Sequence, residues 1–525
     1  MKFLQRFLSI SVVCSLLAAG CQEGSPTPEE KPSKRISLSG QTSAGETCTE
    51  SLQARIDAAA PGDTVQAKPC IYREQVVIDK PLTLRGRPGS EIRGSEVWID
   101  WEERSNLWRS EERLPEFPQT AVECMPGTDR CLWPEQVFFD GEPLLQVAHN
   151  PGPEEFAVDD DRRVVLGQDP GGHLVEVTVR RHWVLGAAEG VTITGFTMRH
   201  AANEGRSGAI MNRMKRLDGG YANWTVQNNR LSDAHGGVIS LSNAPGLRIL
   251  NNEIYRGGQL GIKSTGCGQI VRGNRIHHNN TEDFNWRWEA GGLKTSHAEG
   301  VRVDSNEFYA NRGNAIWFDI DSSNNTISNN RIHHNSRRGI HYEISEYGKI
   351  FDNVLWENGW GTPERGLGAA ISLGNSRNTE IHGNVMAWNA GGISVIGIDR
   401  EGTYWDSVHG IHVHDNVILA EDYPEDPVEH FALAWLQGWS TQMFDPANDN
   451  RGENNAYWYP TPEGDATRYE WAKTAYSRLA DFNATPGEEN GRYLTRDEKD
   501  ALVAEKGIPA APERHGARRW SGQFR

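Results

Sequence analysis

A short pattern of apolar and polar positions recurs along the middle of the chain. It reads Val/Ile-x-x-Asn-x-apolar, and its Asn falls at Asn229, Asn252, Asn274, Asn306, Asn330, Asn353, Asn384 and Asn416. Successive copies lie about 23 residues apart, or about 32 where a segment is inserted. One short strand cannot bury its apolar face alone, so coils of this period must stack on a shared core. The pattern predicts a solenoid of parallel strands over residues 186–420, with the Asn side chains hydrogen-bonded in one file.

This period, combined with an Asn ladder, resembles right-handed parallel β-helix proteins of the pectate-lyase-like superfamily. The resemblance implies an all-β solenoid, with an N-terminal cap and first coils over residues 46–96, where a short helix at 51–60 precedes a strand. Residues 97–185 break the repeat and predict an inserted antiparallel β-subdomain. Residues 421–525 are aromatic and irregular, and predict a C-terminal tail with one short helix.

The N-terminus predicts an exported, lipid-anchored protein. Two positive charges precede an apolar stretch that is too short to span a bilayer. The segment Leu17-Ala18-Ala19-Gly20-Cys21 resembles the lipobox of bacterial lipoproteins, which implies removal of a signal peptide at 1–20 and acylation of Cys21. Residues 21–45 are rich in Pro, Ser, Glu and Gly and predict a flexible tether. The alternative is an ordinary secretory signal with an incidental cysteine.

Gln22 follows the lipobox cysteine, so we expect the cell envelope as the location, and the outer membrane if the cell is Gram-negative. The membrane is then contacted through the lipid anchor only. The net charge of −17 excludes nucleic acid as the partner, because phosphate binding needs a basic face. We expect a monomer whose partner is a polysaccharide or oligosaccharide.

Five cysteines lie beyond the lipobox, in a compartment that permits disulfides. Four of them allow three pairings, and we favour Cys48–Cys70 and Cys124–Cys131 because each pair lies within one local segment. Cys267 is then unpaired. None has the clustered spacing of a zinc site, and the acidic turns contain no complete calcium ligand set. We therefore expect no metal and no other cofactor, with calcium at the acidic turns left open as an alternative that nothing in the sequence indicates.

A second strand in each coil begins with a small residue followed by an inward apolar one. Side chains alternate along a strand, so the next position points outward. The outward stripe then consists of Lys263, Lys294, Trp317, His341, Ser372 and Ser394. Two residues further lies a second stripe of Thr265, Ser296, Asp319, Glu343, Gly374 and Ile396. Insertions at 280–291, 359–369 and 397–409 are expected to leave the solenoid at one edge and to wall a cleft beside these stripes.

Asp319 and Glu343 are neighbours on adjacent coils in this alignment. Stacked strands lie roughly 4.8 Å apart, which matches the carboxyl separation of retaining glycosidases, roughly 5–5.5 Å, rather than that of inverting enzymes. Like charges at this distance raise one pKa. The pair therefore predicts an acid beside a nucleophile.

The motifs Ala315-Ile316-Trp317-Phe318-Asp319 and Gly339-Ile340-His341-Tyr342-Glu343 resemble the paired motifs of β-helical glycoside hydrolases of the β-xylosidase type. The resemblance implies that Asp319 is the nucleophile and Glu343 the acid/base. The chain departs from the family after Asp319, so the sugar stays open. We expect Trp317 to be a sugar platform, Lys263, Lys294 and His341 to contact substrate, and the lip of the cleft to include Trp286, Trp288 and Glu289.

Two other classes of function stay open at this point. A uronate polysaccharide lyase would use Lys294 as base, although the equivalent place one coil later holds Trp317 instead of the Arg that such lyases have. A non-catalytic glycan-binding or structural solenoid would carry Asp319 and Glu343 as ordinary solvated strand residues. The sequence names neither the sugar nor the linkage.

Overall fold

The computed structural model describes residues 34–37, 45–212, 222–361, 365–422, 430–462 and 464–512. The predicted signal peptide, Cys21 and nearly all of the predicted tether lie outside these residues. Within the described ranges, no helix has the length and apolar character needed to cross a membrane.

The body is a solenoid of three parallel sheets, named sheets I, II and III here, and each coil gives one strand to each sheet in that order. Sheet I contains β4 (Val76–Ile78), β16 (Val184–Gly186), β19 (Gly208–Asn212), β22 (Gly237–Leu241), β25 (Leu260–Cys267), β28 (Gly291–Glu299), β31 (Asn314–Asp319), β35 (Ile340–Glu343), β39 (Ala369–Gly374), β42 (Gly391–Gly397), β45 (Leu433–Gln437), β48 (Tyr469–Trp471) and, antiparallel to β48, β49 (Thr474–Tyr476).

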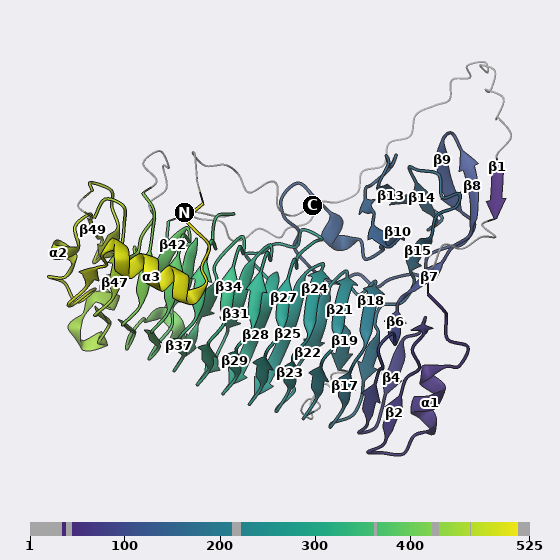
Figure 1. Ribbon diagram of the computed structural model, residues 1–525, viewed down its shortest axis with the longest axis horizontal. Helices are drawn as coiled ribbons and strands as arrows, with labels where there is room; N and C mark the ends of the chain where they lie inside the picture. The colour runs from purple at the N-terminus through teal and green to yellow at the C-terminus, as the bar shows by residue number, and fades with distance from the viewer. Residues whose placement is uncertain are drawn as a thin grey trace, which may run out of the picture.

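Sheet II follows the lower edge of the solenoid in Figure 1. It contains β2 (Thr64–Gln66), β5 (Thr83–Arg85), β17 (Thr192–Thr194), β20 (Thr225–Gln227), β23 (Arg248–Leu250), β26 (Ile270–Arg272), β29 (Arg302–Asp304), β33 (Thr326–Ser328), β37 (Lys349–Phe351), β40 (Glu380–His382), β43 (His412–His414) and β46 (Arg451–Glu453).

Sheet III follows the upper edge in the same view (Figure 1). It contains β3 (Ile71–Tyr72), β6 (Glu91–Arg93), β18 (Thr197–Ala201), β21 (Arg230–Ala234), β24 (Glu253–Gly257), β27 (Arg275–His277), β30 (Glu307–Tyr309), β34 (Arg331–His333), β38 (Val354–Trp356), β41 (Val385–Ala387), β44 (Val417–Leu419), β47 (Ala456–Trp458) and β50 (Arg492–Tyr493).

The Asn ladder is present and orders the turns between sheets II and III. From Asn229 to Asn416, each Asn donates its side-chain amide to the next at 2.9–3.1 Å. Each also donates to a backbone carbonyl of the previous coil, as Asn330 does to Val303 at 2.9 Å. Buried polar groups must be paired, so this file stabilises the register of every coil. A second file follows β27 and its successors and contains Asn279, Asn311, Asn335, Asn358 and Asn389.

The solenoid continues beyond residue 420, in the region that the sequence had assigned to a tail. Strands β45, β46 and β47 add a further coil in register with β42, β43 and β44. The ladder extends to Asn455, which donates to Glu488 at 2.8 Å. Helix α2 (Leu479–Phe482) lies at this end, and α3 (Arg496–Lys506) lies along the exterior of sheet III, where Arg331 donates to the carbonyl of Lys506 at 2.9 Å (Figure 1).

The N-terminal end has the predicted cap. Helix α1 (Leu52–Ala58) buries Leu52 and Ile56, with its first turn capped by Ser51. The coil is interrupted between β6 and β16 by the inserted subdomain, drawn above the right-hand end of the solenoid in Figure 1. Its two sheets, largely antiparallel, contain β1 (Lys34–Ser37), β7 (Ser95–Val97), β8 (Asp100–Arg104), β9 (Leu107–Ser110), β10 (Val137–Phe139), β11 (Glu142–Pro143), β12 (Leu145–Gln146), β13 (Glu155–Val158), β14 (Val164–Leu166) and β15 (Val175–Thr178).

The cysteines pair as the sequence favoured. Cys48 is joined to Cys70 and Cys124 to Cys131, while Cys267 is free and exposed. The first bridge ties the segment before α1 to β3, and the second closes a small loop of the inserted subdomain around a 3-10 turn at Arg130–Leu132.

The expectation that all three insertions leave one edge of the solenoid is wrong. The insertions at 280–291 and 359–369 lie between sheets III and I, whereas the one at 397–409 follows β42 and lies between sheets I and II. The loops therefore flank sheet I on both sides, because sheet I has a turn at each end of its strands.

Candidate active site

The outward face of sheet I has the predicted register. Lys263, Lys294, Trp317, His341, Ser372 and Ser394 pair in one row from β25 to β42. The residues just before them, such as Ile262, Leu293 and Ile316, are fully buried in the core. The stripe is not a solvated strand face, however, since Trp317 and His341 are each only 5% exposed. The flanking loops cover it.

Asp319 ends β31 and is held by one cation. Its carboxylate lies 2.8 Å from the ammonium of Lys294 and accepts the backbone N–H of Ile320 at 2.9 Å. The side chain is 9% exposed. Because Trp317 and Phe318 pair with His341 and Tyr342, Asp319 lies one coil before Glu343. The two predicted carboxylates therefore occupy equivalent places on adjacent strands.

Glu343 has two partners on separate elements. Arg400 donates to one carboxylate oxygen at 2.6 Å, and the Nε2 of His341 lies 3.1 Å from the other. Burial opposes ionisation of Glu343, but the hydrogen bond with His341 and the charge of Arg400 outweigh it and hold its pKa well below the usual range. The rise in pKa predicted for the acid is therefore not found at Glu343. The prediction considered only like charges and omitted the cations.

His341 connects this carboxylate to the backbone. Its Nδ1 lies 3.2 Å from the carbonyl of Ser372, and its Nε2 faces Glu343. Burial lowers the pKa of His341, which favours the neutral ring. A neutral imidazole carries one N–H and cannot donate to two acceptors. Both contacts are hydrogen bonds only when the His341–Glu343 pair takes up one further proton, so the pair is a place to store and release a proton.

Trp317 does not present a free ring face to solvent. The ammonium of Lys294 lies 3.6 Å from its ring centroid, and the His341 ring lies beside it at 5.6 Å. The predicted sugar platform at Trp317 is thus not available in this arrangement, because neighbouring side chains of the stripe occupy its surface. Its role is to pack Lys294 against Asp319.

The lip residues lie beside the stripe, as expected. Glu289 is buried and forms an ion pair with Lys263, and Arg206 approaches it at 3.7 Å. Burial lowers the pKa of Lys263, an effect that Glu289 opposes. The Trp288 carbonyl accepts from Lys294 at 3.0 Å. Both lysines of the stripe are therefore ion-paired.

Trp286 lies further out in the same loop. Its carbonyl accepts from Arg337 at 3.0 Å, and its ring packs at the edge of a small apolar cluster that includes Cys131 and Phe284. Trp286 thus connects the 280–291 loop to the inserted subdomain. Among the described residues, it makes no hydrogen bond or ring contact with Asp319 or Glu343.

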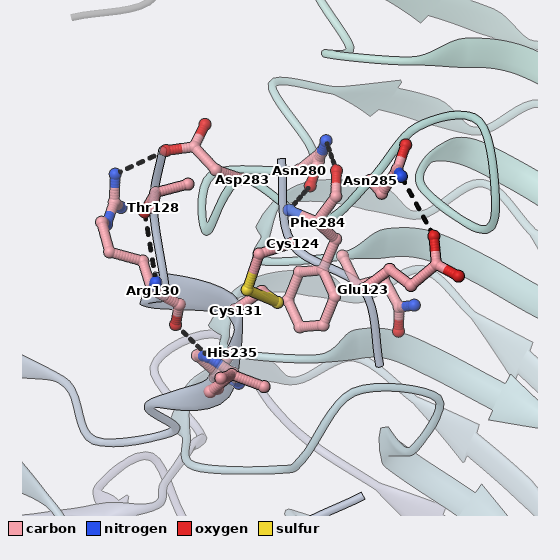
Figure 2. The surroundings of a disulfide bond; sticks show 12 residues. Glu123, Cys124, Thr128, Arg130, Cys131, His235, Asn280, Asp283, Phe284 and Asn285 are labelled. Atoms are coloured by element: carbon pink, nitrogen blue, oxygen red, sulfur yellow. Dashed lines mark hydrogen bonds and ion pairs between the residues drawn. A yellow bond between two sulfur atoms is a disulfide. The ribbon is translucent and has the colours of Figure 1, made fainter. Parts of the chain in front are cut away.

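A disulfide-closed loop anchors this side of the site (Figure 2). The Cys124–Cys131 bridge lies against Phe284, and the Met125 N–H donates to the Asp283 carbonyl at 2.8 Å. Arg130 forms ion pairs with Glu282 at 2.7 Å and Asp283 at 3.1 Å. The inserted subdomain thereby fixes the 280–291 loop that carries Glu289. No sequence motif predicts this docking, since the two loops are about 150 residues apart.

The opposite side is formed by the 397–409 loop. A short 3-10 turn at Tyr404–Asp406 folds back so that Asp406 accepts the N–H of Arg400 at 2.8 Å. Trp405 donates its indole N–H to Asp321 at 2.7 Å. Arg400 is the main site residue that sequence reasoning missed. Its loop was recognised as an insertion, but no motif marks an arginine 57 residues from its partner.

Comparison with known proteins agrees with the architecture. Residues 216–386 match a family described as "Right handed beta helix region". No curated protein matches the chain in sequence. The chain is a right-handed parallel β-helix protein with an inserted β-subdomain.

Solved structures share this fold at low sequence identity. XylC, solved in complex with xylose, superposes with a TM-score of 0.63 at 16% identity, covering 84% of this chain and 82% of that one. A structure named "Glycoside hydrolase" has a TM-score of 0.43 at 10% identity, covering 84% and 92%. The A-module of Azotobacter vinelandii mannuronan C-5 epimerase AlgE6 has a TM-score of 0.47 at 12% identity, covering 84% and 93%.

Proposed function

We propose that the chain is a carbohydrate-active enzyme, a retaining glycoside hydrolase with Asp319 as nucleophile and Glu343 as acid/base. The observation that carries the proposal is the placement of these two carboxylates at equivalent positions of β31 and β35, beside the 397–409 loop that supplies Arg400. Strand spacing of roughly 4.8 Å favours the short carboxyl separation of a retaining mechanism. XylC, a protein of the same fold, has been solved in complex with the sugar xylose.

Asp319 suits the nucleophilic role because its carboxylate is buried and lies 2.8 Å from the ammonium of Lys294. In the first step, a carboxylate oxygen of Asp319 would attack the anomeric carbon while the leaving oxygen takes a proton, giving a glycosyl ester. In the second step, water would attack the same carbon and release Asp319. Lys294 has no competing role as a free base, since its ammonium is bound by Asp319 and by the Trp288 carbonyl.

Glu343 suits the acid/base role through its pairing with His341. The proton that the pair takes up would pass to the leaving oxygen, and the carboxylate would then accept a proton from the attacking water. Both oxygens of Glu343 are occupied, one by Arg400 and one by His341. One of these contacts must open for proton transfer. Arg400 is the candidate, because it belongs to a loop and not to the strand.

A substrate screen tests the proposal against the other two classes. Purified protein is incubated with aryl glycosides and with neutral and acidic polysaccharides, and both reducing ends and ultraviolet absorbance are measured. A hydrolase releases reducing ends without absorbance, whereas a uronate lyase creates an unsaturated product that absorbs. Absorbing products would replace the proposal by a lyase, and binding without any new ends would leave a glycan-binding solenoid.

We further propose that the mature protein is anchored to the cell envelope through lipid on Cys21. The two disulfides support export, since such bonds persist in oxidising compartments. Detergent partitioning of the wild type and of Cys21→Ala tests the anchor. The wild type is expected in the detergent phase and the variant in the aqueous phase. Equal partitioning would contradict lipidation.

A further inference from the structure

A cluster of histidine and glutamate side chains lies on the outer face of sheet II, on strands other than those of the candidate active site. Glu380 of β40, His412 and His414 of β43 and Glu453 of β46 belong to three successive strands. Val413, between the two histidines, is fully buried, so both imidazoles point away from the core. An His-x-His pair on one strand therefore lies between carboxylates from the strands on either side.

The four side chains contact diagonal neighbours and not the residues directly opposite them on the adjacent strands. In register, Glu380 is opposite His412, and Glu453 is opposite His414. The contacts are diagonal, however, with Glu380 at 3.1 Å from the Nε2 of His414 and Glu453 at 2.9 Å from the Nε2 of His412. The imidazole centroids are 4.1 Å apart. The two diagonals cross, so each carboxylate meets the histidine that lies diagonally opposite it.

The donor spacing suits a tetrahedral metal. One donor atom each from Glu380, His412 and His414 lie within 4.8 Å of one another. Zinc bonds of roughly 2.0–2.1 Å place neighbouring ligand atoms about 3.3 Å apart, close to the 3.1 Å between Glu380 and the Nε2 of His414. This is the one such cluster within the described residues.

A second carboxylate orients one ligand. The Nδ1 of His414 lies 2.7 Å from Asp415, while its Nε2 faces the cluster centre. Zinc-bound histidines characteristically donate their other ring N–H to a carboxylate in this way, which fixes the tautomer and strengthens the ligand.

The geometry points to a binding site for a divalent transition metal of the zinc type, with His412, His414 and Glu380 as ligands and Asp415 as the residue that orients His414. Imidazole nitrogens favour zinc and its neighbours, whereas calcium and magnesium prefer oxygen ligands alone. The ion would link β40 and β43, which belong to two consecutive coils, and would stabilise that end of the solenoid. It is separate from the proposed glycosidase chemistry.

Zinc titration of the metal-stripped mature chain tests this site. We expect one equivalent of zinc by calorimetry and a raised thermal midpoint, with no rise from calcium at equal concentration. His412→Ala and His414→Ala should each weaken binding by at least tenfold, and Asp415→Asn by about tenfold. Cobalt in place of zinc should give the intense visible bands of a tetrahedral site in the wild type and lose them in the double variant His412→Ala/His414→Ala.

Matched controls distinguish zinc binding at this site from binding to the free thiol or to a histidine elsewhere in the protein. His333→Ala removes a histidine from the outer face of sheet III, and Cys267→Ser removes the free exposed thiol, so both should bind zinc as the wild type does. Circular dichroism confirms that each variant is folded. Zinc affinity retained in the double variant His412→Ala/His414→Ala, or no binding by the wild type, would overturn the assignment. Glycosidase activity is not a readout here, so failure of either proposal leaves the other intact.

Discussion

The outer faces of sheets III and I share one repeat but have opposite character. On sheet III, Tyr255, His277, Tyr309, His333 and Trp356 stack ring on ring, with centroids 4.1–5.2 Å apart and planes within 13°. On sheet I, the equivalent row changes chemistry at almost every coil and is buried under loops. A row of similar aromatic side chains stabilises the stacking of the coils. A row whose residue types change from coil to coil and form ion pairs indicates a functional site.

The largest expected effect is the loss of activity when a carboxylate of sheet I is removed. Asp319→Asn removes the proposed nucleophile but keeps its size and its contact with the Ile320 N–H. We expect kcat to fall by more than about a thousandfold while the thermal midpoint changes little. The matched control is Asp304→Asn on sheet II, which removes a similar ion pair, with Arg272 at 2.7 Å. Equal activity of both variants would mean that Asp319 is an ordinary strand residue.

The next effect concerns stability and not activity. Asn330→Ala deletes hydrogen bonds to Asn353 and to the Val303 carbonyl and leaves the Asn306 amide group without its acceptor. Each buried group left unpaired costs roughly 1–3 kcal/mol, so the free energy of unfolding should fall by about 3 kcal/mol. Denaturant titration measures it. A loss below about 1 kcal/mol would show that the ladder is not a principal source of stability.

The end of the ladder predicts a pH dependence. Burial raises the pKa of Glu488 to about 7. Its unfolded value is lower, so the folded state binds the extra proton, and this stabilisation is lost as pH rises towards 7. The wild type should lose roughly 2–3 kcal/mol between pH 5 and pH 8. Glu488→Gln should lose less over that window, and parallel stability curves for the two proteins would contradict the prediction.

The smallest expected effect tests whether Arg400 lowers the pKa of Glu343. Its guanidinium is one of the groups that lower the pKa of Glu343. In Arg400→Gln that carboxyl should hold its proton to higher pH, so the alkaline limb of the kcat/KM profile should move up by about one pH unit. Arg377→Gln, which alters the arginine beside Trp405 on the same side, is the control and should leave the limb in place. An unmoved limb in Arg400→Gln would exclude Glu343 as the group that titrates there.

The solenoid and the row of the two carboxylates were predictable because both follow from the repeat. Once Asn306 and Asn330 fix the period, Asp319 and Glu343 are placed by counting along the strands. The repeat does not predict which residues of the inserted segments contact the site. Arg400 and the Cys124–Cys131 loop come from insertions whose paths depend on long-range packing. The burial of Trp317 does not follow from the repeat either, because it depends on how Lys294 and His341 pack against its ring.

Chemical rescue of Glu343→Ala tests the central claim most directly. With an aryl glycoside that has a good leaving group, the variant should still form the ester on Asp319, because such a group departs without protonation. Azide should then replace the base-activated water, raise the rate and give a glycosyl azide of retained configuration, identified by NMR. Equal defects on activated and unactivated substrates, with no azide product, would contradict the acid/base role of Glu343. A product of inverted configuration from the wild type would contradict the retaining mechanism itself.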